Sequence, residues 1–222
     1  MLWHKAIGAG VKPQGPVEYI GSVTKSADDA QNWDAAEESL DILSIAETGD
    51  LVVIAFSFDG PADGTFSWNG MPFTPIYSQT SATTPGRYVG FRRVQADDEN
   101  PFVSDVTAGT WADLSIVASV FRNAFSLSGN EIATSTTGMP NPPALTANGR
   151  LWVITGHLDD DVVTDWVAPA NYTLADYEVN GSSNAASSTA IAYRIEDLTS
   201  DDPEAFTGSG DDTWAATTLA FN

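Results

Sequence analysis

The chain has 222 residues, of which 42% are hydrophobic, so it is long enough to bury the core of one sizeable domain. Nine basic against 30 acidic residues give a formal net charge of −21, and a surface this negative disfavours binding to nucleic acids and to anionic membranes. The absence of cysteine excludes disulfides, thiol catalysis and cysteine-based zinc sites.

Residues 1–16 are predicted to form an N-terminal arm, because glycine and proline recur there and discourage regular structure. Residues 1–25 carry three lysines and one glutamate, a net charge of +2, whereas the remainder carries six arginines and 29 acids, a net charge of −23. The arm either caps its own domain or docks onto another chain. In the docking interpretation, the partner-binding residues are Leu2, Trp3, His4, Lys5, Ile7 and Lys12.

The first half of the remaining chain is predicted to consist of strands separated by polar turns. Residues 17–24 and the region around 40–45 indicate two strands, and the continuous apolar run 51–58 is typical of a central strand covered on both faces. Residues 87–94 add a further strand. In residues 113–121 apolar and polar side chains alternate, as they do in a strand with one buried face.

The second half begins after a proline-rich linker, residues 134–143, which is not expected to continue any ladder of strands. It then repeats the series of strands. These are expected at residues 150–157, 171–177, 188–195 and 213–221. No segment shows sustained helical periodicity.

The two halves share a series of landmarks in the same order, about a hundred residues apart. The pairs are Gly49-Asp50-Leu51-Val52-Val53-Ile54 with Gly149-Arg150-Leu151-Trp152-Val153-Ile154, Trp68 with Trp166, Phe73-Thr74 with Tyr172-Thr173, Arg93-Val94 with Arg194-Ile195, Phe102 with Phe206, and Thr110-Trp111 with Thr213-Trp214. The chain therefore contains two copies of one supersecondary unit.

Each copy offers too few strands to bury a sheet face alone, so the copies are expected to face each other across one core. We predict an all-β, jelly-roll-like β-sandwich at residues 17–222 with an internal pseudo-twofold repeat. The half-repeats span about 39–133 and 144–222. Trp111 and Trp214 are expected to be equivalent core anchors.

The sequence contains no recognisable catalytic arrangement. His157 ends a predicted strand shortly before Asp159-Asp160-Asp161, but no partner serine or nucleophile motif accompanies it. We interpret it as a surface histidine whose pKa is raised by nearby acids, and we predict neither a catalytic residue nor an enzyme.

Two other features suggest ligands. The related acidic turns contain Asp97, Asp98, Asp201 and Asp202, which either bind calcium or form solvated turns. Trp68 and Trp166 lie in loops, where they either stack on the sugars of a host surface glycan or plug the ends of the sandwich. No other cofactor is expected.

The order of these landmarks resembles a diffuse group of β-sandwich modules in virion proteins of tailed phages and gene-transfer-agent-like particles. The opening Leu2-Trp3-His4-Lys5 with Gly8-Ala9-Gly10 is similar to the short arms by which phage head-attached proteins insert between capsid subunits. The resemblance implies a non-enzymatic decoration or spike component of a virion, a homo-oligomer that contacts capsid or other virion proteins. The alternative is a carbohydrate-binding or host-adhesion module, including a tail-associated location.

Overall fold

The computed structural model describes most of the chain beyond the predicted arm, of which it includes Gly15 and Pro16. The described residues are 15–27, 40–58, 65–68, 71–81, 84–99, 104–105, 113–159, 163–181 and 186–222.

Strands make up nearly all of the regular structure in these residues. Those of the first half are β1 (Glu18–Ala27), β2 (Leu51–Phe58), β3 (Thr65–Trp68), β4 (Met71–Pro72), β5 (Thr74–Ser81), β6 (Thr84–Arg93), β7 (Ser104–Asp105) and β8 (Leu114–Arg122), with one short 3-10 helix, η1 (Ile42–Ser44). Those of the second half are β9 (Leu127–Ser135), β10 (Gly149–Asp159), β11 (Thr173–Gly181), β12 (Ala186–Leu198) and β13 (Trp214–Phe221). No helix in the described segments is long and apolar enough to span a membrane.

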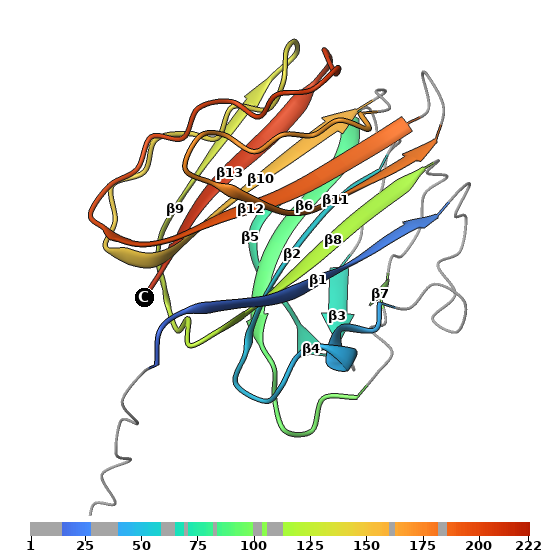
Figure 1. Ribbon diagram of the computed structural model, residues 1–222. Helices are drawn as coiled ribbons and strands as arrows, with labels where there is room; N and C mark the ends of the chain where they lie inside the picture. The colour runs from blue at the N-terminus through green and yellow to red at the C-terminus, as the bar shows by residue number, and fades with distance from the viewer. Residues whose placement is uncertain are drawn as a thin grey trace, which may run out of the picture.

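The strands form two antiparallel five-stranded sheets that pack face to face (Figure 1). The first sheet has the order β1-β8-β2-β6-β5 and the second has the order β11-β12-β10-β13-β9. A small three-stranded sheet, β4-β3-β7, is formed by residues of the first half. The predicted fold class, an all-β sandwich, is confirmed.

Each half of the chain builds one complete sheet, and the two sheets repeat the same strand order. Strands β1, β8, β2, β6 and β5 correspond in turn to β9, β13, β10, β12 and β11. The central strands also share their register. Leu51 lies opposite Phe121 in the first sheet, and Leu151 lies opposite Phe221 in the second, each residue 100 positions after its counterpart.

The boundary between the halves lies at residues 123–126, earlier in the chain than predicted. The predicted half-repeats, 39–133 and 144–222, are shifted from the observed units, which run from β1 to β8 and from β9 to β13. β9 reaches into the predicted linker at 134–143 and pairs with β13, so this linker does not separate the halves. The strand escaped prediction because it lies at a sheet edge and has no buried side chain.

The observed strand register also changes one of the landmark pairs predicted from the sequence, by one residue. Arg92 lies opposite Val52 in the first sheet, and Arg194 lies opposite Trp152 in the second. Since Val52 and Trp152 are equivalent, the counterpart of Arg194 is Arg92 and not Arg93. The difference matters because neighbouring strand residues point to opposite faces of a sheet.

The tryptophan that opens the last strand has a different counterpart from the one predicted. Trp214 lies opposite Leu158, just as Leu114 lies opposite Phe58. Leu114 therefore occupies the equivalent position, and Trp111 lies outside the described residues. Trp214 is buried as expected, but it packs on the outer face of the second sheet and not between the sheets.

Apolar side chains form three layers, one between the two sheets and one on the outer face of each sheet. The layer between the sheets contains Leu51, Val53, Ala55, Val89, Val117, Phe121, Leu151, Val153, Ile191, Leu219 and Phe221. The outer face of the first sheet packs against Leu40, Ile42, Ala46, Phe73 and Val94. The outer face of the second sheet packs against loop residues Val163, Trp166 and Phe206. Because both faces of each sheet are covered, the central strands β2 and β10 contain continuous apolar runs, at residues 51–56 and 151–154.

The two sheets approach each other most closely on the side formed by β1 and β11. Tyr19 of β1 stacks on Tyr193 with 4.6 Å between ring centroids, and its hydroxyl donates to the carbonyl of Ala175 at 3.2 Å. On the opposite side, β5 and β9 do not come as close. The sandwich is therefore closed along one side and more open along the other.

Candidate functional site

The predicted attachment arm leaves the sandwich at a fixed point. Asn123, in the connection between the halves, donates from Nδ2 to the carbonyl of Pro16 at 2.9 Å. The guanidinium of Arg150 reaches the carbonyl of Gly15 at 3.4 Å, and Val17 is buried in the core between the sheets. Residues 15–17 consequently belong to the folded domain, so the part that can serve as an arm is residues 1–14.

The same end of the sandwich carries the C-terminus and the connection between the halves (Figure 1). Asn222 exchanges backbone hydrogen bonds with this connection, receiving one from the Phe125 amide at 2.5 Å and donating one to Ser126 at 3.0 Å. A shallow groove of about 220 Å³ lies beside the exit point. It is lined by Asn148, Gly149, Arg150, Asp197, Leu198, Thr199 and Asn222.

The six residues predicted to bind a partner all lie within residues 1–14 and so outside the described residues. They are Leu2, Trp3, His4, Lys5, Ile7 and Lys12. The structure shows the point at which this segment joins the sandwich. The contacts of the segment with a partner stay a prediction.

The two acidic turns contain equivalent ion pairs. Arg92 at the end of β6 pairs with Asp98 in the following turn, and this pair is almost fully buried. Its counterpart Arg194 in β12 pairs with Asp201 at 3.3 Å. The Asp98 carboxylate also accepts a hydrogen bond from the backbone amide of Gln95 at 2.7 Å, which closes the turn. The repeat thus places an arginine in a strand and its aspartate in the next connection.

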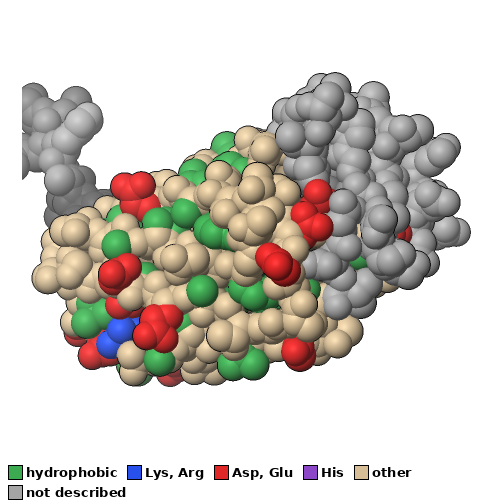
Figure 2. All heavy atoms as spheres, turned by 90° about the horizontal axis from the view of Figure 1, so that it is seen from above, with side chains coloured by type: hydrophobic (Ala, Val, Ile, Leu, Met, Phe, Trp, Pro, Cys, Tyr) green, Lys and Arg blue, Asp and Glu red, His purple; other side chains and the backbone are tan. Residues whose placement is uncertain are grey.

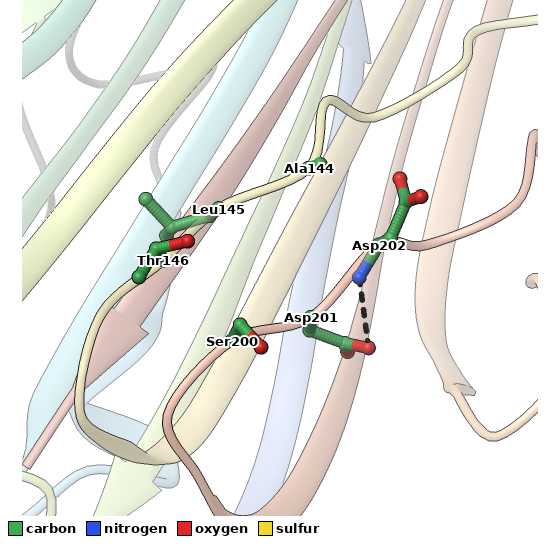
Figure 3. A pocket seen from close by; sticks show the side chains of 6 residues that line it. All are labelled: Ala144, Leu145, Thr146, Ser200, Asp201 and Asp202. Atoms are coloured by element: carbon green, nitrogen blue, oxygen red, sulfur yellow. Dashed lines mark hydrogen bonds between the residues drawn. The ribbon is translucent and has the colours of Figure 1, made fainter.

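The second turn borders a shallow pocket of about 390 Å³ (Figure 3). The carboxylates of Asp201 and Asp202 point in different directions, and the Asp202 amide donates to Asp201 Oδ1 at 3.1 Å. Asp201 Oδ2 also accepts from the Tyr172 hydroxyl at 2.8 Å. Burial is the main cause that raises the pKa of the Tyr172 phenol above its ordinary 10.0, and the hydrogen bond to the Asp201 carboxylate raises it further.

These contacts give the calcium candidates Asp98 and Asp201 a structural role, since each faces an arginine. Asp97 is exposed in its turn and Asp202 at the rim of the pocket. Within the described part of the chain, no group of three or more His, Asp or Glu side chains is arranged to hold a metal ion. The two ion pairs account for Asp98 and Asp201, and calcium binding at these turns stays a prediction.

His157 lies inside the sandwich, which corrects its prediction as a surface histidine. It has no exposed surface, and its Nε2 lies 3.2 Å from the Thr155 hydroxyl. Burial and then the neighbouring charge of Arg87 lower its pKa to about 3, the opposite direction from the one expected. The imidazole is therefore neutral and sealed from solvent by the surrounding strands.

His157 belongs to a buried polar layer at one end of the space between the sheets. Arg87 of β6 crosses this space and donates to the carbonyl of Thr213, next to β13, at 2.8 Å. Burial lowers the pKa of its guanidinium, while the charge of Asp159 acts in the opposite direction. Ser115 and Thr189 join the two sheets through their hydroxyls at 3.0 Å. This polar layer gave no sequence signal apart from serine and threonine at inward positions of the strands.

Trp166 is a buried plug on the outer face of the second sheet, not at an end of the sandwich as predicted, and it does not offer a sugar platform. Only 4% of the residue is exposed, and its ring meets Phe206 edge-on with 5.3 Å between centroids. The glycan-binding interpretation of Trp166 is therefore not supported, because stacking on a sugar requires an exposed ring face. Trp68 ends β3, and its side chain lies outside what the structure describes.

Gly156 allows the Trp166 plug to lie directly on β10. A Cβ atom at this position would come within 2.9 Å of the Trp166 ring and 3.2 Å of Phe206. We expect Gly156→Ala to lower the free energy of unfolding by about 1–3 kcal/mol, measured by urea denaturation, because the plug must shift. Gly21→Ala is the matched control, since its Cβ would meet Ile45 at an ordinary 3.4 Å. Equal stability of the two variants would contradict this packing.

Carboxylates are dispersed over the face of the molecule shown in Figure 2, with few basic side chains among them. Comparison with known proteins yields no assignment. No protein-family model matches the chain, and neither a curated protein nor a solved structure matches it significantly. The chain is therefore not placed in a family, and its function has to be argued from its own geometry and charge.

Proposed function

We propose that this protein is a non-enzymatic structural component of a phage-type virion, attached to the outside of the head through residues 1–14. The observation that carries the proposal is the anchored exit of this segment. The sandwich holds Gly15 and Pro16 at one end, and the segment that follows outward contains Lys5 and Lys12 and no acidic residue.

Two arginines near the exit already pair with carboxylates of the sandwich. Arg150 pairs with Asp197 at 3.7 Å. Arg122, at the end of β8, binds Asp50 through two hydrogen bonds of 3.0 Å and also contacts Glu47. A cationic segment that leaves this end of an acidic sandwich can also meet acidic groups on another chain. The apolar residues Leu2, Trp3 and Ile7 would supply the buried contacts of that interface.

Deleting residues 1–14 tests the role of the segment. We expect the thermal unfolding of the sandwich to stay nearly unchanged, because all described hydrogen bonds of Gly15 and Pro16 are retained, and we expect attachment to particles to be lost. Trp3→Ala should cause most of the same loss, since a buried tryptophan is a typical anchor residue. Attachment is measured by co-sedimentation with particles purified from cultures that lack the gene.

Two results would overturn the proposal. One is co-sedimentation of the truncated protein at the wild-type level. The other is the absence of the protein from purified particles of the source organism, where mass spectrometry should find it in a fixed ratio to the major capsid protein. Lys25→Ala, which changes a basic residue of β1 within the folded domain, serves as the control for charge alone.

A further inference from the structure

The strand β9 is an exposed edge of the sandwich. It pairs with β13 on one side, and no described residue pairs with its other side. Ile132 lies near its middle and is 38% exposed, and among the exposed large hydrophobic residues of the described chain it is the one on an edge strand. An edge of this kind presents unpaired amide and carbonyl groups that can add another strand.

The other three edges carry features that oppose such pairing. β5 contains Pro75 and two register irregularities. β11 contains Asp176 and Glu178 and an irregularity beside the first of them. β1 contains Lys25 and lies on the closed side of the sandwich. β9 has one acid and no proline, and its ladder is regular from Gly129 to Ser135.

We propose that β9 pairs antiparallel with β9 of a second copy of this chain, with Ile132 opposite Ile132. The argument for a second copy is that the strand is self-complementary in this register. Ile132 is the centre of the regular stretch 129–135, so all seven of these residues find a partner. Glu131 then lies opposite Ala133, and no two acids of the strand face each other.

Neighbouring registers fit less well. A shift by one residue would turn the sandwich cores to opposite faces of the joined sheet, because side chains alternate along a strand. A shift by two in one direction, which places residue 131 opposite itself, sets two glutamates side by side, and like charges directly opposite each other destabilise a pair of strands. In the proposed register, two isoleucines on the inner face bury each other and the second sheet continues across both molecules.

The oligomeric state tests this inference independently of the proposed virion role. The acidic bodies repel each other, so we expect a dimer in sedimentation equilibrium that strengthens in about 1 M sodium chloride, where the Debye length is about 3 Å. Ile132→Lys should raise the dissociation constant about tenfold or more, because it sets two ammonium groups opposite each other. Val167→Lys makes the same charge change on an exposed loop residue and should leave the dimer intact.

Single cysteines test the register, because the chain has none of its own. With oxidised glutathione as the oxidant, Ile132→Cys should form a disulfide-linked dimer, since directly opposite Cβ atoms lie about 5 Å apart. Asn130→Cys lies on the same face of the same strand, but its two copies would be about 13 Å apart in this register and should not link.

A wild-type chain that stays monomeric in high salt would overturn the proposal. So would a dimer that Ile132→Lys and Val167→Lys weaken equally, or cysteines at 130 and 132 that link at the same rate.

Discussion

Replacing Asp98 by alanine is expected to lower the free energy of unfolding by about 3–5 kcal/mol, because the Arg92 guanidinium would stay buried after losing the carboxylate that compensates its charge. The side chains of Arg92 and Asp98 are 7% and 1% exposed. Removing one member of a buried pair costs far more than the pair contributes by itself, since the remaining charge cannot reach water.

The second half of the chain provides the matched control. Asp201→Ala removes the equivalent carboxylate from a pair whose side chains are 19% and 13% exposed. We expect a smaller loss of about 1–2 kcal/mol, because Arg194 keeps its contact with Glu196 and can reach solvent. Urea denaturation of both variants gives the comparison. Equal losses in the free energy of unfolding for the two variants would contradict the explanation by burial.

The stability of the protein should also fall between about pH 6.5 and pH 3 because of His157. In the folded state its pKa is about 3, whereas the unfolded chain has the ordinary value of 6.5. Between these values the unfolded chain binds a proton that the folded chain excludes, so acid favours unfolding. The slope reaches about 1.4 kcal/mol per pH unit for one such proton. The contribution is fully present above the unfolded pKa and is lost as the pH falls.

His157→Gln isolates this contribution from the many carboxylates that titrate in the same range. Glutamine stays neutral and retains a polar group beside Thr155. The difference between wild type and variant in free energy of unfolding, measured by urea denaturation from pH 7 to pH 4, should shift in favour of the variant by about 2–3 kcal/mol. A difference that is constant with pH would mean that the imidazole is protonated in the folded protein.

The repeat was the part of the fold that could be predicted best from the sequence. Residues 51–54 and 151–154 are apolar throughout because their strands are central and covered on both faces, so burial left a strong pattern. β9 left none, because its side chains are partly exposed and its contribution is the hydrogen-bonded ladder to β13. Composition cannot reveal a strand whose stability comes mainly from its backbone.

The candidate site was harder to predict, because polar residues look the same in sequence whether they are solvated or enclosed. His157 followed by acids suggested a surface turn, yet the strand continues to Asp159 and both side chains are buried. The Arg92–Asp98 and Arg194–Asp201 pairs had a visible signal in the repeat, an arginine followed six or seven residues later by an aspartate. The prediction missed this spacing because it aligned Arg93, not Arg92, with Arg194, and only the fold distinguishes paired charges from ligands of a metal.

The sequential construction of the two sheets has a consequence for synthesis on the ribosome. The first sheet is complete once Arg122 has emerged, but the apolar face that includes Val53 and Val117 is covered only when strands up to Phe221 arrive. At about 5–20 residues per second, the intervening hundred residues take about 5–20 s. During that interval the nascent chain carries a finished sheet with an unburied face, which makes the first half the aggregation-prone stage of its biogenesis.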